Sequence, residues 1–244
     1  MFCGAYLEAL AKISIDLAKK ARSESFLGGL LITLEGIEGS GKSTQMRFIQ
    51  SRLSGLGIPH VCSREPGGTG LCADLRALLL APHPSGEKWD PLAELLLFSA
   101  DRAQHLETVV RPALREGKVV VLDRFEDSTR AYQGAQGVSQ STMSTLGQIV
   151  LDGLKPDLTL LLDADPEKTQ SRAAARNKLQ DGFSETRFDA ESLVFHKKVR
   201  EEFLRIARQE PSRVRIVNGE ASQEKVADDV WAAVSQKLEE ANVR

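Results

Sequence analysis

Residues 30–44 read LLITLEGIEGSGKST, and this is the most informative part of the chain. The apolar first half predicts a buried strand, the glycines predict a tight turn, and a helical pattern begins directly after the turn. Glycines allow successive backbone N–H groups to point inward, and a helix N-terminus adds partial positive charge. The stretch therefore predicts a strand, an anion-binding loop and a helix in direct succession.

The loop has the pattern of a phosphate-binding loop (P-loop). Residues 36–43 fit G-x-x-x-x-G-K-[ST], in which Lys42 reaches the β- and γ-phosphates and the Ser43 hydroxyl ligates Mg²⁺. A chance match in a flexible loop is the alternative, but a strand and a helix flank the pattern as the motif requires. The residues expected to bind ATP here are Gly36, Ile37, Glu38, Gly39, Ser40, Gly41, Lys42, Ser43 and Thr44.

The composition favours one large globular domain. The chain has 244 residues, of which 41% are hydrophobic and 27% are charged, which is enough to build a full core. A net charge of −2 does not suggest a nucleic-acid partner or an acidic membrane surface. No apolar run approaches the roughly 18 residues of a membrane span. The three cysteines are too few for a disulfide framework or a zinc site, so we expect reduced thiols in a cytoplasmic protein.

Strands and helices alternate along the chain after residue 29. Apolar runs predict five strands, at residues 30–34, 60–63, 118–122, 157–162 and 214–217. The alternation predicts an α/β fold with three layers, in which helices flank a five-stranded parallel sheet on both faces. Ligands of such folds bind beyond the carboxyl ends of the strands, where the P-loop, Arg64 and Asp123 fall.

Residues 1–29 are interpreted as an N-terminal extension, either helical or disordered. Leu7, Leu10 and Leu17 approximate a helical period, while the acidic residues argue against a transit peptide. A start codon upstream of a shorter protein is the alternative explanation for this segment.

Asp123 and Arg124 directly follow the third predicted strand, so both side chains are expected beside the P-loop. A carboxylate there can hold Mg²⁺, and an arginine offers a planar fork for phosphate oxygens. A surface ion pair is the alternative.

The surrounding sequence carries a family resemblance. Residues 121–133 read VLDRFEDSTRAYQ and resemble the signature of thymidylate kinases, which contains an apolar pair, D-R-[aromatic], S-[small] and A-[aromatic]-[polar]. Three further segments agree with that family: REPGGT at 64–69, LFSADR at 97–102 and DADPE at 163–167. The resemblance implies a P-loop kinase domain at 30–244 with a short lid at about 172–188.

The resemblance also implies roles for individual residues. Phe98 matches the residue that stacks on thymine in the family, although its spacing also suits a core position, and Arg102 matches one that lies over or beside the base. Arg124 matches the arginine that grips the acceptor phosphate. The remaining dTMP-binding residues implied are Arg64, Thr129, Tyr132 and Gln133, the last three reading thymine and excluding a ribose 2′-hydroxyl.

The P-loop indicates a subtype of the family. Glu38-Gly39 resembles the bacterial type, which supplies its catalytic arginine from the lid, where Arg176 falls in the matching place. Arg172 precedes it and is assigned to ATP binding. Extra residues lengthen the lid before Arg187, so the role of Arg187 stays open between catalysis and a solvated loop.

The implied activity is transfer of the γ-phosphoryl group from ATP to dTMP, giving dTDP and ADP for dTTP synthesis. Lys42, Arg124, Arg176 and Glu38 are the implied catalytic residues, and Ser43 with Asp123 the implied Mg²⁺ ligands. The family resemblance implies a homodimer.

Two alternatives to this activity remain. The first is a kinase of the same fold for another deoxynucleotide or for a nucleoside, with Glu35 or Glu65 as the base. The second is a P-loop nucleotide switch, which would leave the acceptor segments unexplained.

Overall fold

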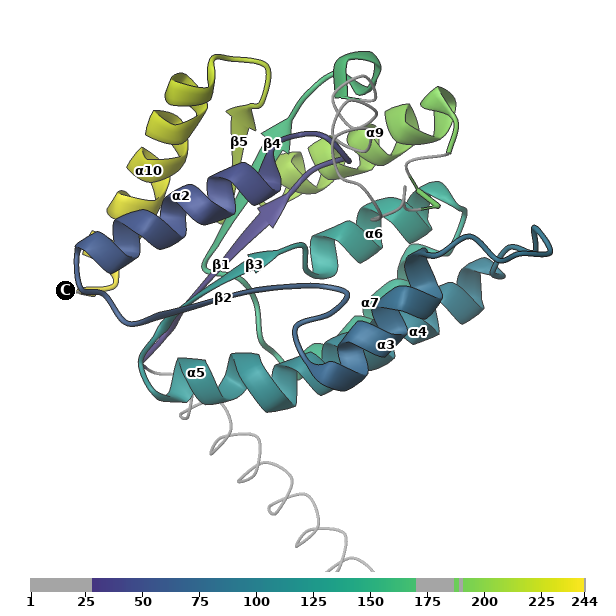
Figure 1. The fold of residues 1–244 in the computed structure, drawn as a ribbon, viewed down its shortest axis with the longest axis horizontal. Helices are drawn as coiled ribbons and strands as arrows, with labels where there is room; N and C mark the ends of the chain where they lie inside the picture. The colour runs from purple at the N-terminus through teal and green to yellow at the C-terminus, as the bar shows by residue number, and fades with distance from the viewer. Residues whose placement is uncertain (1–27, 170–186, 189–190, 244) are drawn as a thin grey trace, which may run out of the picture.

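The computed structural model describes residues 28–169, 187–188 and 191–243, which form an α/β fold around one sheet (Figure 1). The strand order is β2-β3-β1-β4-β5 and every neighbouring pair is parallel, as predicted. The predicted extension up to residue 27, Arg172 and Arg176 lie outside the described residues. The strands are β1 (Leu30–Glu35), β2 (His60–Arg64), β3 (Val119–Asp123), β4 (Leu158–Asp163) and β5 (Val214–Asn218).

Helices cover both faces of this sheet, which confirms the predicted three layers (Figure 1). Helices α2 and α10 pack on one face, while α5, α6 and α9 lie on the other with α4 and α7 beside them. No helix in the described ranges is long and apolar enough to span a bilayer. The α-helices are α2 (Lys42–Gly55), α3 (Gly70–Leu80), α4 (Pro91–His105), α5 (Arg111–Arg115), α6 (Glu126–Ala135), α7 (Gln140–Leu151), α9 (Leu193–Gln209) and α10 (Gln223–Glu240).

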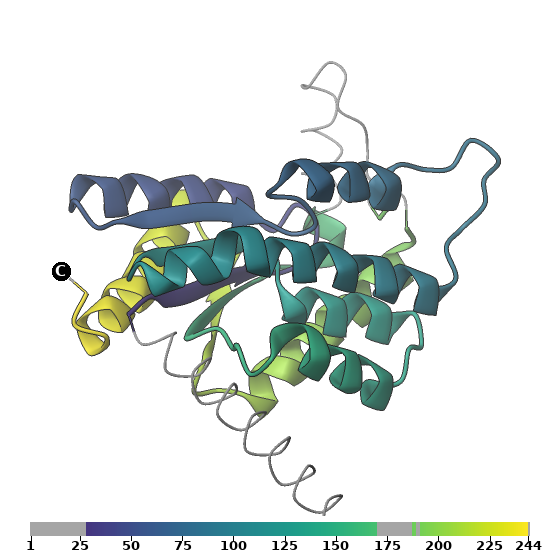
Figure 2. The same cartoon turned by 90° about the horizontal axis from the view of Figure 1, so that it is seen from below.

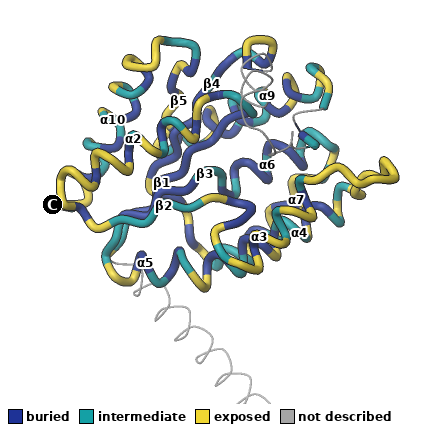
Figure 3. Tube along the Cα trace, viewed as in Figure 1, coloured by how far each residue is buried: buried dark blue, intermediate teal, exposed yellow. Residues whose placement is uncertain are grey.

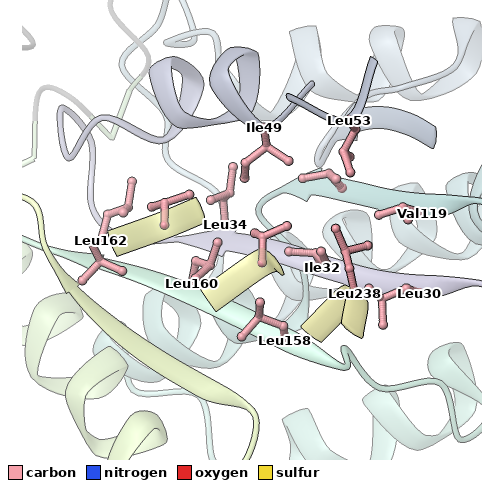
Figure 4. Packing of buried hydrophobic residues seen from close by; sticks show 14 of the residues in the cluster. Leu30, Ile32, Leu34, Ile49, Leu53, Val119, Leu158, Leu160, Leu162 and Leu238 are labelled. Atoms are coloured by element: carbon pink, nitrogen blue, oxygen red, sulfur yellow. The ribbon is translucent and has the colours of Figure 1, made fainter. Parts of the chain in front are cut away.

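The two-residue period of β1 assigns its side chains to the two faces of the sheet. Leu30, Ile32 and Leu34 join the core cluster beneath α2 and α10 (Figure 4). Leu31 packs into a separate cluster on the opposite face. Glu35 belongs to the same set as Leu31 by this alternation, so its side chain reaches the start of α6. β1 is buried along its whole length (Figure 3).

A nearly continuous helical path runs from the Asp90 cap to Arg115, with one irregular turn. The Asp90 carboxylate accepts hydrogen bonds from the N–H groups of Leu92 and Ala93, and Pro91 occupies the first helical position. α4 continues through a π-helical turn, η1 (Leu106–Val110), into α5 (Figure 2). This wider turn ends two residues before Pro112, which has no N–H to donate to the preceding turn.

Helix α6 is not predicted by the sequence pattern. Its buried face is largely polar and includes Asp127, Ser128, Thr129 and Gln133. A helix of this kind has no apolar stripe to reveal its period. These polar side chains are buried because they form hydrogen bonds with β1 and α4.

The core cluster of Figure 4 yields a stability prediction. Leu160 of β4 is fully buried in this cluster, so Leu160→Ala should lower the free energy of unfolding by about 2–5 kcal/mol. Leu56→Ala is the matched control, because Leu56 is 59% exposed and should change stability by about 0.5 kcal/mol or less. Urea unfolding followed by circular dichroism measures both values. Equal effects of the two substitutions would contradict this description of the core.

Candidate active site

The P-loop wraps around the amino group of Lys42. Lys42 Nζ donates hydrogen bonds to the carbonyl oxygens of Gly36 at 2.9 Å and Ile37 at 2.8 Å. A Cβ atom on Gly36, whose φ is +138°, would lie 2.6 Å from the Leu162 carbonyl oxygen, so only glycine fits there. Burial and the neighbouring Arg124 lower the pKa of Lys42 to about 8. An anionic ligand would stabilise its charged form.

Ser43 and Asp123 lie together at the start of α2 and the end of β3. Ser43 Oγ donates to Asp123 Oδ2 at 3.4 Å, and the buried Oδ1 atom has no hydrogen-bond partner in the described part of the chain. Oxygen ligands of this type suit Mg²⁺, which in phosphoryl-transfer sites takes few protein ligands besides phosphates and water. The described residues contain no cluster of three or more His, Cys, Asp or Glu side chains that could hold a metal. The residues expected to hold Mg²⁺ therefore fit that ion.

Arg124 has a left-handed backbone conformation with φ of +71°. Such a conformation is costly for a non-glycine residue and persists where neighbouring contacts enforce it. The Arg124 N–H donates to the Leu34 carbonyl oxygen at 2.9 Å, and the next N–H, of Phe125, donates to Glu35 Oε1 at 2.8 Å. These two bonds to β1 hold the turn that carries the Arg124 side chain.

The Arg124 guanidinium connects the P-loop to α6. Its Nη1 atom donates to the Gly36 carbonyl oxygen and to Ser128 Oγ, each at 3.0 Å. Its Nη2 atom donates to Glu38 Oε1 at 2.8 Å and to Tyr132 Oη at 3.2 Å. The guanidinium carbon also lies 5.0 Å from the centroid of the Tyr132 ring.

Glu38 is the carboxylate of this group. Tyr132 Oη donates to Glu38 Oε2 at 2.6 Å, and His196 Nδ1 lies 3.6 Å from the same oxygen. Burial alone would raise the pKa of Glu38. The charges of Arg124 and Lys42 outweigh this effect, so the pKa lies below its usual value. The structure thus brings together four of the predicted site residues, Lys42, Glu38, Arg124 and Tyr132.

A further cation, Arg76 of α3, escaped the sequence interpretation. Its Nη1 atom donates to the Pro66 carbonyl oxygen at 2.8 Å. Burial lowers the pKa of Arg76, and the nearby charges of Arg64 and Arg124 lower it further. The available signal was a lone arginine in the otherwise apolar run LRALLL at 75–80, a few residues after the REPGGT segment at 64–69.

Arg102 of α4 is almost fully buried and all of its donor groups face α6 or the end of β2. Nε donates to Glu65 Oε2 at 2.7 Å, Nη1 to Glu126 Oε2 at 2.6 Å, and Nη2 to Thr129 Oγ1 at 3.0 Å. His105, one turn further along α4, contacts the other oxygen of Glu65 at 3.0 Å. The predicted dTMP residues Arg102 and Thr129 are therefore in direct contact.

Phe98 and Gln133, the other predicted base-reading residues, lie beside the last part of the predicted lid. The Phe98 ring centroid is 6.4 Å from that of Phe188. Gln133 Nε2 donates to Glu94 Oε1 at 2.6 Å, and the other oxygen of Glu94 pairs with Arg187 Nη2. Arg187 is thus paired with a helix on the predicted base-reading side of the site.

Comparisons with known proteins identify the family of this chain. A sequence model of the thymidylate kinase family matches residues 34–230. The chain is 45% identical to a thymidylate kinase of Syntrophotalea carbinolica over 208 residues, which cover 85% of this chain and 95% of that protein. The chain belongs to the thymidylate kinase family. The resemblance noted in the sequence is thereby confirmed.

Other relatives support the same placement. A thymidylate kinase of Pelobacter propionicus is 42% identical over 209 residues, covering 85% of this chain and 94% of that protein. The crystal structure of thymidylate kinase from Ehrlichia chaffeensis has a TM-score of 0.66 and 33% identity, and the match covers 85% of this chain and 99% of that one. Each of these matches covers at least 94% of the relative.

Lys42 provides the first test of this site. Lys42→Ala should reduce phosphoryl transfer by at least about 100-fold, because a buried cation directed at the phosphates is lost. The fold should be retained, as judged by circular dichroism and thermal unfolding. Near-normal turnover in this variant would contradict the P-loop assignment. Lys225→Ala, which removes an exposed lysine of α10, is the matched control and should leave turnover unchanged.

Proposed function

We propose that this protein transfers the γ-phosphoryl group of ATP to dTMP, giving dTDP and ADP in dTTP synthesis. One observation carries the proposal: Lys42 Nζ and Arg124 Nη1 both donate to the carbonyl oxygen of Gly36. A cation for the donor phosphates and a cation for the acceptor phosphate therefore converge on one peptide group. Relatives named thymidylate kinase, at 41–45% identity, support dTMP as the acceptor.

Transfer to a phosphate oxygen needs positioning and charge neutralisation rather than a general base. Lys42 neutralises the donor phosphates, Arg124 holds the acceptor phosphate, and Arg176 from the lid neutralises the transferring group. Glu38, which is bonded to Arg124, orients the acceptor or the metal. Mg²⁺, when bound by Ser43 and Asp123, supplies Lewis-acid neutralisation of phosphate charge. Closure of the lid excludes the water that would otherwise hydrolyse ATP.

The remaining roles follow the family. ATP is bound by residues 36–44 together with Arg172. The base and sugar of dTMP are held on the side of α4 and α6, which the contact between Arg102 and Thr129 joins. The dTMP-binding residues in this proposal are Arg64, Phe98, Arg102, Arg124, Thr129, Tyr132 and Gln133.

A nucleoside acceptor is less well supported. It would need a carboxylate base at its 5′-hydroxyl. Glu35 accepts from the Phe125 N–H and the Ser128 hydroxyl, so both of its oxygens are engaged. Glu65 is likewise engaged by Arg102 and His105. Neither carboxylate is placed as a free base.

The test is an ADP-release assay with a panel of acceptors that includes dTMP, dUMP, dCMP, dAMP, dGMP and thymidine. We expect ADP formation to depend on the acceptor and to be fastest with dTMP. Faster release with thymidine would favour a nucleoside kinase. Release without any acceptor, at the same rate, would favour a nucleotide switch.

We also propose that the kinase domain, residues 30–244, forms a homodimer. Helix α3 packs on α4, and α4 packs on α7 (Figure 1). Apolar patches on adjacent elements mark interaction surfaces. The exposed apolar side chains of these helices are Leu71, Leu78, Leu92, Leu96 and Ile149.

We place the protein in the cytoplasm and residues 1–29 outside the kinase domain. The free thiols of Cys62 and Cys72 support a reducing compartment.

The dimer proposal predicts a surface effect. Leu96 of α4 is 51% exposed, and Leu96→Glu should give a monomer, because burying a carboxylate in an apolar contact is unfavourable. Val194→Glu on α9, where Val194 is 64% exposed, is the matched control and should leave the dimer intact. Sedimentation equilibrium at micromolar concentration measures both. A monomeric unmodified protein would contradict the dimer.

The two arginines should separate kinetically. Arg124 is held on the scaffold, so Arg124→Ala should raise the KM for dTMP, with kcat reduced as alignment loosens. Arg176→Ala should mainly lower kcat, by on the order of 10³-fold, because its contact belongs to the transition state. Arg176→Lys should restore little of the lost kcat, because the point charge of an ammonium group cannot replace the two-pronged contact of a guanidinium with phosphate oxygens. Steady-state kinetics with each substrate varied measures these effects. Loss of kcat in Arg187→Ala but not in Arg176→Ala would contradict the assignment of the lid role to Arg176 and favour Arg187.

A further inference from the structure

The side-chain amide of Gln133 donates a hydrogen bond to the carboxylate of Glu94, and both residues are almost fully buried. The distance from Gln133 Nε2 to Glu94 Oε1 is 2.6 Å. Because an amide is planar, this bond directs the carbonyl oxygen of Gln133 away from that carboxylate oxygen. The positions of the amide acceptor and of its second N–H donor are then both defined.

The opposite amide orientation is disfavoured by charge. Turning the Gln133 amide by half a turn would place its carbonyl oxygen against an oxygen of Glu94, and neither atom could donate. Arg187 reinforces this restriction, because its permanently charged guanidinium pairs with the second oxygen of Glu94. An ionised carboxylate only accepts hydrogen bonds, so the amide nitrogen of Gln133 must face it.

Arg187 is itself firmly held. Its Nε atom donates to the Leu79 carbonyl oxygen at 2.5 Å, and its backbone N–H donates to the Leu80 carbonyl oxygen at 2.9 Å. The next residue, Phe188, packs edge-on against Tyr132 with ring centroids 5.2 Å apart. The contacts of Glu94 therefore tie α4 and α6 to the end of α3.

We propose that Glu94 is a specificity-determining positioning residue, which fixes the amide of Gln133 so that the site accepts bases with an N3–H and rejects cytosine. The proposal rests on the contact between Gln133 and the base in the proposed function. Thymine and uracil present an N3–H donor beside a C4 carbonyl acceptor. Cytosine presents the reverse, an N3 acceptor beside a C4 amino donor, which only the turned amide would match.

The experiment compares dUMP with dCMP, because these acceptors differ only at the N3–C4 edge of the base. Glu94→Gln keeps the size of the side chain but can both donate and accept, so both orientations of Gln133 become allowed. We expect the ratio of kcat/KM for dUMP to that for dCMP to fall at least about tenfold. The ratio of kcat/KM for dTMP to that for dUMP should not change, because these acceptors differ only in the methyl group of the base. The KM for ATP should not change either, because it depends on the donor site.

Two variants act as controls. Glu191→Gln makes the same chemical change at a carboxylate that pairs with the exposed Lys88, and it should leave every ratio unchanged. Gln133→Ala removes the amide itself and should also lower the ratio of dUMP to dCMP. If Glu94→Gln does not fold, as judged by thermal unfolding, Arg187→Met replaces it. This variant removes the cation that pairs with the second oxygen of Glu94, so the carboxylate is no longer held against Gln133 and the ratio should fall.

The outcomes separate the inference from the function on which it rests. A wild-type protein that does not phosphorylate dTMP would overturn the proposed function. An unchanged ratio in Gln133→Ala would overturn the contact between Gln133 and the base, and the inference with it. A lowered ratio in Gln133→Ala, with no change in a folded Glu94→Gln or in Arg187→Met, would overturn the role of Glu94 alone.

Discussion

The buried carboxylate of Glu35 joins the end of β1 to the turn that carries Arg124. One oxygen accepts from the Phe125 N–H at 2.8 Å, and the other accepts from the Ser128 hydroxyl at 2.5 Å. Burial, followed by the charge of Asp127, raises the pKa of Glu35 to about 8. A polar group this deeply placed is tolerated because its acceptors are satisfied. These two bonds fix the residues that follow Arg124, and so they support its left-handed backbone conformation.

The sheet topology explains why so few residues are needed to join the two halves of the site. β1 and β3 are neighbours in the sheet although more than eighty residues separate them, and Leu34 stands opposite Asp123 in the register. The P-loop follows β1 and the Asp123-Arg124 turn follows β3, so both emerge from the centre of the same edge. β2 contributes its own carboxyl end next to β3, with Arg64 opposite Asp123. The parallel arrangement thus assembles the site from three consecutive strand ends.

Sequence patterns predict the features that depend on local chemistry. The P-loop and the five strands follow from glycine content and apolar runs, and the strands and the helix after the loop are present. α6 escaped prediction because its buried face is polar, and that face is selected by contacts with β1 and α4 that no local pattern encodes. The same holds for Glu94, whose partners Gln133 and Arg187 come from distant segments. The placement of Arg102 was predicted only through resemblance, and its three partners became visible only in the fold.

The bond between Arg124 and Glu38 has a consequence for small anions. Glu38 acts as a built-in counter-ion, because its carboxylate occupies one edge of the guanidinium and is itself held by Tyr132. In the proposed role of Arg124, an incoming phosphate exchanges with this resident negative charge, and the electrostatic gain is the difference between two similar attractions. Inorganic phosphate or sulfate has only its charge to offer in that exchange. A nucleotide adds the contacts of its sugar and base, so the pocket distinguishes its acceptor from the far more abundant anions of the cell by what is attached to the phosphate.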